Sequence, residues 1–153
     1  MDTHLLSQAE SIQDHLQLIE HELSDFLDFT SVDKILDESK DVEINFIQTI
    51  FKEFRYIAVY SGEGKKAINR ILMDQRIEET LVDKVYKGIY FKCVNEFFSP
   101  HHEVWYEDSR ASYRNKFSID FYTKPGMLIE DTIKKIEPSF HHIRDQLDYL
   151  DLS

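Results

Sequence analysis

The sequence predicts an all-α protein, an antiparallel four-helix bundle with one long connection, able to hold a hairpin, between helices 3 and 4. Apolar residues recur at alternating intervals of three and four along most of the chain, as on one face of a helix. Only four glycines and three prolines occur, which are too few for a sheet with many turns. The length of 153 residues suits a single helical-bundle domain, residues 1–153, with a sizeable core.

The first expected helix has the clearest pattern. Its apolar residues alternate in steps of four and three, which places them on one seam. This seam consists of Leu5, Ala9, Ile12, Leu16, Ile19, Leu23 and Phe26. A short helix through Leu36 follows, and Thr30 or Ser31 is expected to cap it.

Asp41 is the expected N-cap of the second long helix. The seam of this helix consists of Ile47, Ile50, Phe54, Ile57, Ser61, Gly64, Ile68 and Ile71. The small residues Ser61 and Gly64 favour close approach of a neighbouring helix, with a pocket mouth as the alternative. The glycines of residues 61–64 also leave a kink or break open, since each costs about 1 kcal/mol relative to alanine.

Asp74 is the expected N-cap of a third helix that runs to about Phe97. Its broad apolar face consists of Leu81, Val82, Val85, Tyr86, Ile89, Tyr90, Cys93, Val94 and Phe97. A fourth helix is expected from near Gly126. Its seam consists of Ile129, Ile133, Ile136, Phe140, Ile143, Leu147 and Leu150. Pro138 lies inside this pattern and predicts a kink near Lys134, because proline removes one backbone hydrogen bond.

The connection between these helices spans roughly 28 residues, and a connection of that length in a compact domain is usually functional or disordered. It holds the only tryptophan and is too aromatic for a solvated tail. Residues 117–123 alternate apolar and polar side chains, which is a strand pattern. Together with residues 104–106 they predict a small hairpin, which would need packing on the helices for stability.

The net charge of −11 argues against nucleic acid and against an anionic membrane as partners. Residues 1–40 carry a sum of about −8, whereas residues 109–124 carry about +3, so the long connection is the basic part of an acidic protein. No signal peptide is visible, and no apolar run approaches the roughly 18–20 residues of a membrane span. With a single cysteine, we expect a soluble cytoplasmic protein.

No metal or cofactor is expected from the spacing of the donor residues. No histidine follows a glutamate by three residues, as a helical di-iron site would require. His101 and His102 are adjacent, and so are His141 and His142, and adjacent residues on a helix do not face one site. A site at His101, His102 and Glu103 is the weak alternative. Cys93 lies on an apolar stripe and is expected to be a buried hydrophobe and not a nucleophile.

The candidate site residues therefore lie in the connection. They are Trp105, Tyr106, Glu107, Asp108, Ser109, Arg110, Tyr113 and Arg114. The leading hypothesis is a non-enzymatic module that binds a protein partner or itself, as a homodimer, with Trp105 and Tyr106 as anchors. The alternative is an anion or small-ligand site that uses charge-assisted hydrogen bonds. Its residues would be Arg110, Arg114, Lys116 and Lys124 together with Ser109, Ser112 and Tyr113. An enzyme is the third hypothesis. In the plain structural interpretation, Trp105 and Tyr106 plug the end of the bundle and Asp108 pairs with Arg110.

The segments 97–100 and 104–110, followed by Tyr113, resemble the central motif of the YpuI-like family of Bacillus-type bacterial proteins. The Trp-Tyr-Glu-Asp-Ser-Arg run at residues 105–110 is its most specific part. The helical pattern on either side is also similar, although Pro138 departs from the uninterrupted last helix of that family. The resemblance implies a small cytoplasmic bacterial protein without an assigned activity, so no catalytic residue can be transferred from it.

Overall fold

The computed structural model describes residues 3–39, 41–74, 76, 78–108, 110 and 117–150. The chain is mostly helical, as predicted, with one small two-stranded sheet. The helices are α1 (Thr3–Phe29), α2 (Val32–Glu38), α3 (Ile44–Met73), α4 (Glu79–Ile89), the π-helical turn η1 (Tyr90–Val94), α5 (Asn95–Phe98) and α6 (Met127–Leu147). The strands are β1 (Trp105–Glu107) and β2 (Ile119–Phe121).

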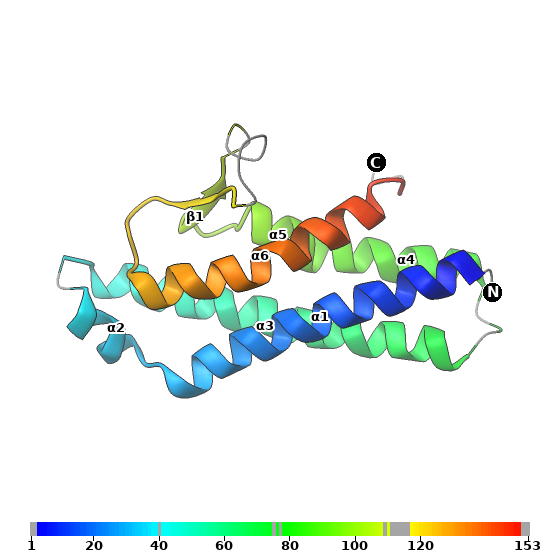
Figure 1. Ribbon diagram of the computed structural model, residues 1–153, viewed down its shortest axis with the longest axis horizontal. Helices are drawn as coiled ribbons and strands as arrows, with labels where there is room; N and C mark the ends of the chain where they lie inside the picture. The colour runs from blue at the N-terminus through cyan, green and yellow to red at the C-terminus, as the bar shows by residue number, and fades with distance from the viewer. Residues whose placement is uncertain are drawn as a thin grey trace.

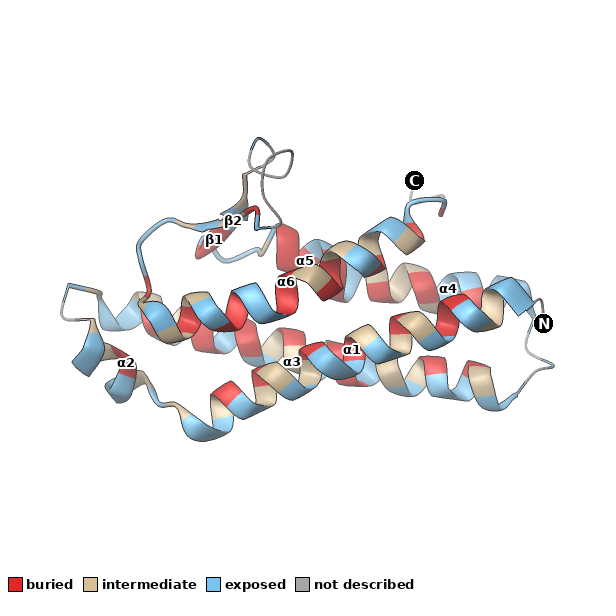
Figure 2. Ribbon diagram, viewed as in Figure 1, coloured by how far each residue is buried: buried red, intermediate tan, exposed pale blue. Residues whose placement is uncertain are grey.

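The long helices run along the long axis of the molecule, and the hairpin lies to one side of them (Figure 1). Helix α1 packs against α3 and α6, and η1 packs against α3 and α6. The buried residues form stripes on the inward faces of these helices (Figure 2). The seam predicted for the first helix is confirmed, since its residues from Ala9 to Phe26 are buried in α1. The cap predicted for the short helix is also confirmed, because the Lys34 backbone N–H donates to Ser31 Oγ at 3.1 Å.

Helix α3 begins later than predicted and does not break. Its N-cap position is Glu43 and not Asp41. It continues through Gly64, where an added Cβ would lie 3.1 Å from the side chain of Ile89 and 3.2 Å from that of Leu16. The small residue therefore serves the close approach of neighbouring helices, as the sequence favoured.

The third helical segment differs from the prediction in where it begins and in a π-helical turn that interrupts it. Asp74 ends α3, with its backbone N–H donating to Arg70 at 3.0 Å, and Glu78 is the N-cap position of α4. A π-helical turn then accommodates one extra residue. Phe97 is fully buried, as its place on the predicted apolar face requires, and Glu96 beside it is 8% exposed. The carboxylate of Glu96 is held beside the core, where it is largely buried.

Helix α6 begins after Gly126, as predicted, and Gly126 has a φ of 101°, which favours glycine. The helix includes Pro138. The predicted hairpin is confirmed as well: β1 and β2 pair antiparallel, with Trp105 opposite Phe121. Trp105 packs against the rings of Phe54 and Phe97, so the small sheet is stabilised by the helices beneath it.

Candidate functional site

The predicted anchor Trp105 belongs to the core. Only 2% of its surface is exposed, and its indole Nε1 donates to the carbonyl oxygen of Phe97 at 2.6 Å. Tyr106, the next residue, faces outward beside Tyr122, with ring centroids 4.9 Å apart. Its hydroxyl donates to Asp120 at 3.3 Å. Trp105 is therefore a core residue beneath the hairpin at the side of the helices and not a plug at the end of a bundle, whereas Tyr106 lies at the surface.

The charged residues of the predicted site point in different directions. Glu107 accepts two hydrogen bonds from Arg144, at 2.9 and 2.8 Å. These hydrogen bonds are the main reason why the pKa of Glu107 is lowered. Asp108 accepts from the backbone N–H of Arg110 at 3.0 Å and lies 3.5 Å from its guanidinium. The Arg110 side chain is 93% exposed. Ser109, Ser112, Tyr113, Arg114 and Lys116 lie outside the described residues. The described members thus form a structural ion pair and a solvated loop and no shared pocket.

A polar cluster fixes the hairpin to α6. The buried Glu137 carboxylate accepts from the backbone N–H of Ser118 at 2.7 Å and from its hydroxyl at 3.1 Å. His141 Nε2 lies 2.9 Å from the same carboxylate, and His141 Nδ1 lies 3.2 Å from Arg144. His141 is only 25% exposed, because Glu137, one turn earlier, draws the imidazole toward the hairpin.

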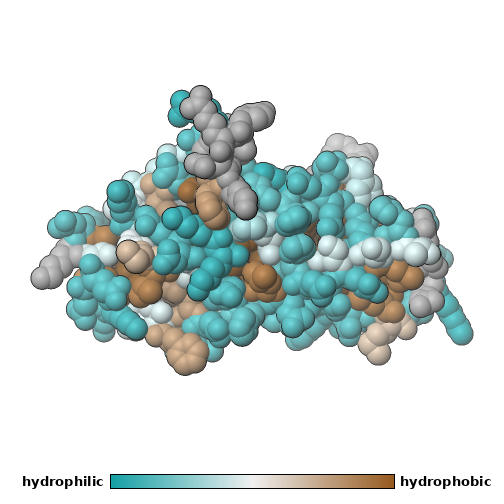
Figure 3. Space-filling view, in the orientation of Figure 1, coloured by the Kyte–Doolittle hydropathy of each residue, from teal (hydrophilic) through white to brown (hydrophobic). Residues whose placement is uncertain are grey.

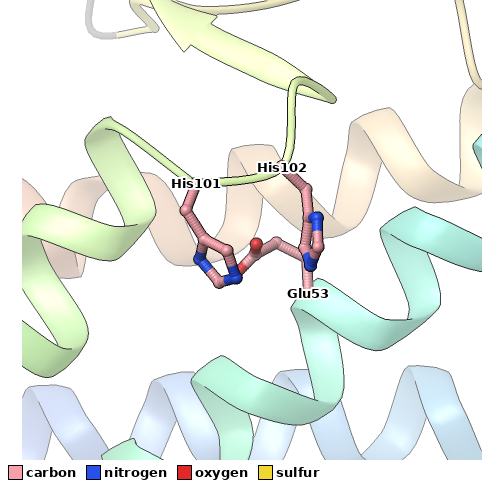
Figure 4. A group of neighbouring side chains, drawn as sticks. All are labelled: Glu53, His101 and His102. Carbon is pink, nitrogen blue, oxygen red and sulfur yellow. The ribbon is translucent and has the colours of Figure 1, made fainter.

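A second carboxylate–histidine cluster shares two residues with the alternative metal site considered from the sequence, but its carboxylate is a different one. It consists of Glu53 on α3 and of His101 and His102 in the turn between α5 and β1 (Figure 4). One possible ligand atom from each residue lies within 4.8 Å of the other two. Glu53 is only 1% exposed, and neither of its carboxylate oxygens has a hydrogen-bond partner of normal geometry among the described residues. The neighbouring Glu96 carboxylate can pair with it only through a shared proton, so the ionised form of Glu53 has no partner there. In Figure 4 this carboxylate lies between the two imidazole rings.

The turn explains how two adjacent histidines reach one place. Helix α5 ends at Phe98, so the rule for adjacent helical residues does not apply to His101 and His102. Their ring centroids lie 4.2 Å apart with an interplanar angle of 40°. The turn closes through a hydrogen bond from the Val104 backbone N–H to the His102 carbonyl at 2.8 Å. Glu103, which the weak alternative included, is exposed and is not part of the cluster.

The electrostatics of this cluster favour a cation. Burial, together with the neighbouring Glu96 carboxylate, raises the pKa of Glu53 to about 8. A buried carboxylate without a partner is costly, and a bound cation relieves that cost by pairing with it. Two imidazoles and one carboxylate are ligands that zinc-class metals accept.

Sequence reasoning missed this cluster because its parts are far apart in the chain. Glu53 is separated from His101 by 48 positions, and the spacing rules for metal sites on helices compare residues within one or two turns. The one local signal is Glu53 itself, which lies next to Phe54 on the apolar side of α3. A carboxylate at such a position is seldom fully buried unless it has a partner.

Comparison with known proteins identifies the family. The model of a family described as "Protein of unknown function (DUF3907)" matches residues 9–153. The chain belongs to this family. The uncharacterised protein YpuI of Bacillus subtilis (strain 168) is 26% identical to this DUF3907 chain over 147 residues, which cover 96% of the chain and 82% of that relative. The family resemblance predicted from the 105–110 motif is thus confirmed. No solved structure gave a significant match.

The helices of the DUF3907 chain were also compared with the requirements of a membrane span. Among the described residues, no helix is both long enough and apolar enough to cross a membrane.

Proposed function

We propose that this DUF3907 protein binds one divalent transition-metal ion through Glu53, His101 and His102. The observation that carries the proposal is the Glu53 carboxylate, which is buried, has no hydrogen-bond partner among the described residues and faces two imidazoles. Buried polar groups are normally paired, and an exception calls for an explanation such as an ion. A metal ion at the centre of the three groups supplies the missing partner.

The donor set indicates the class of metal. Calcium and magnesium take mainly oxygen ligands, whereas imidazole nitrogen suits zinc, cobalt, nickel, copper and iron. The His101 side chain is 59% exposed, so one side of the site is open to solvent. With three protein ligands, a tetrahedral metal keeps one position for water or another small ligand.

The test is calorimetric titration of untagged, metal-free protein with Zn²⁺, repeated with Co²⁺ followed by its visible absorption. The wild type is expected to bind one equivalent. Glu53→Gln keeps the shape of the side chain but removes the charge, and it should weaken binding at least 100-fold, since a primary ligand is lost. Glu103→Gln is the matched control, because it removes the same charge from an exposed neighbour outside the cluster. Absence of binding by the wild type, or equal affinity of Glu53→Gln, would refute the proposal.

A second candidate function is the protein-interaction module predicted from the sequence. Trp105 is buried and no longer supports this function. The outer face of the hairpin does support it, because Tyr106 and Tyr122 are 37% and 60% exposed there. Elsewhere on the face shown in Figure 3, apolar side chains form separate spots within a hydrophilic surface. Light scattering on the wild type and on Tyr122→Ser tests self-association through this face. A monomer in both cases would refute it.

We retain three other expectations as part of the proposal. An antiparallel four-helix bundle is supported by the packing of α1 with α3 and α6 and of α4 with α3. A cytoplasmic location is supported by the free, buried Cys93. An anion site in the 98–124 connection is supported by the exposed guanidinium of Arg110.

A further inference from the structure

We infer that Glu96 is a positioning residue, which holds His101 with its Nδ1 protonated and its Nε2 free to bind the metal. This inference rests on the proposed metal site and identifies the group that prepares it. Glu96 is not one of the three possible ligands. Its carboxylate contacts His101, which is one of the three, at Nδ1.

The contact geometry sets the tautomer of His101. Glu96 Oε1 lies 2.5 Å from His101 Nδ1, and it also accepts from the His101 backbone N–H at 3.3 Å. Because Glu96 Oε1 already accepts from the His101 backbone N–H, the same oxygen acts as the acceptor toward Nδ1, which then carries the hydrogen. A neutral imidazole has a single N–H, and its lone pair is then on Nε2. In Figure 4 one ring nitrogen of His101 lies beside the Glu53 carboxylate, where this lone pair is needed.

Glu96 lies in α5, which follows the π-helical turn directly. Phe97 beside it is fully buried, and the Glu96 side chain is 11% exposed. The His101 side chain is 59% exposed, so Glu96 is the buried partner of this pair. The bond to the His101 backbone also shapes the turn that carries both imidazoles.

This arrangement is the one by which outer carboxylates tune metal-binding histidines. A carboxylate that accepts from the second ring nitrogen fixes the orientation of the ring and raises the basicity of the ligand nitrogen. Loss of such a partner typically lowers metal affinity 10–100-fold. Glu96 also repels Glu53 in the metal-free protein. A cation between the two carboxylates attracts both, so the repulsion does not oppose the role of Glu96 once metal is bound.

Glu96→Gln is the informative substitution, because the amide can either accept from or donate to Nδ1 and so no longer selects one tautomer. In metal-free protein, nitrogen-15 NMR of the His101 ring should show hydrogen on Nδ1 in the wild type and a shift toward the Nε2–H form in Glu96→Gln. Titration with Zn²⁺ should show a 10–100-fold loss of affinity with an unchanged stoichiometry of one. Glu103→Gln should leave both readouts unchanged.

The outcomes separate this inference from the metal site itself. If the wild type binds Zn²⁺ and Glu96→Gln binds it equally well, the role of Glu96 is refuted and the site stands. If the wild type binds no Zn²⁺, the site is refuted and the role of Glu96 with it. The tautomer of the wild type needs no variant, so hydrogen on Nε2 of metal-free His101 refutes the inference even if Glu96→Gln does not fold.

Discussion

The sharpest prediction is that Glu53→Gln makes the metal-free protein more stable while it abolishes metal binding. A residue kept only for the fold would show a loss of stability on substitution. Glu53 is buried between two imidazoles and lacks a hydrogen-bond partner among the described residues, so its charge opposes folding. The glutamine amide has nearly the same shape, carries no charge and can donate to the neighbouring Glu96 carboxylate.

The magnitude follows from the pKa of Glu53. Burial raises it from 4.5 to about 8, so at pH 7 the folded protein holds this carboxyl protonated whereas the unfolded chain ionises it. Between the unfolded pKa and pH 7 lie roughly 2.5 units, and one unit corresponds to about 1.4 kcal/mol, which gives an upper limit of about 3.5 kcal/mol. Local relaxation reduces this value, so we expect Glu53→Gln to add about 1–3 kcal/mol to the free energy of unfolding.

The pH dependence has a definite sign. Because the folded pKa of Glu53 lies above the unfolded one, the unfolded chain binds fewer protons, and wild-type stability falls as the pH rises from 4.5 to about 8. Urea denaturation of both proteins in EDTA at several pH values measures the difference. It should be small near pH 5 and largest near pH 8. A Glu53→Gln variant that is less stable than the wild type at pH 7, or a difference independent of pH, would refute the reasoning.

Metal should then shift the balance toward the wild type. With free Zn²⁺ at 100 times the dissociation constant, the wild type gains about 2.7 kcal/mol, because only the folded state binds. Glu53→Gln, with an affinity at least 100-fold lower, gains about 0.4 kcal/mol or less at the same concentration. Glu103→Gln, in which an exposed carboxylate changes, should remain within about 0.5 kcal/mol of the wild type in both conditions.

Three further predictions concern the rest of the structure. Arg144→Met should lower the free energy of unfolding by about 1–2 kcal/mol at pH 7 through loss of the pair with Glu107. In urea denaturation this loss should shrink as the pH falls through the lowered pKa of Glu107, and a loss independent of pH would contradict it. Burial and the stacked His142 lower the pKa of His15, so stability should fall below pH 6.5, and His142→Gln should reduce that fall when both proteins are compared at pH 7.5 and 5.5. Trp105→Ala should cost about 3–5 kcal/mol in thermal or urea unfolding, and a smaller cost than 1 kcal/mol would show that the indole is not a core residue.

Local patterns predicted the elements of the fold well. The seam of α1 follows from spacing alone, since residues three and four apart share a face of any helix. The hairpin was predicted from the alternation in residues 117–123, and its strands pair as expected. The helix starts at Asp41 and Asp74 were misplaced because several neighbouring acidic or polar residues can occupy the capping position.

The features that the sequence did not predict depend on packing between distant segments. No local pattern marks the π-helical turn. The contact of Glu96 with His101 depends on the turn that follows α5, and the approach of Glu53 to His101 and His102 depends on packing between distant segments. Spacing rules for residues on one regular helix cannot anticipate such a cluster.

The two carboxylate–histidine clusters show why the proposed site is the one at Glu53. Both contain a glutamate that is 1% exposed and an imidazole close to it. Glu137 accepts hydrogen bonds from the Ser118 amide and hydroxyl in addition to its contact with His141, so its charge is already compensated. Glu53 has no such partner among the described residues, although burying it costs the fold as much. Because the two carboxylates differ in hydrogen bonding, the compensated cluster explains the attachment of the hairpin, and the uncompensated one supports the proposal of a bound cation.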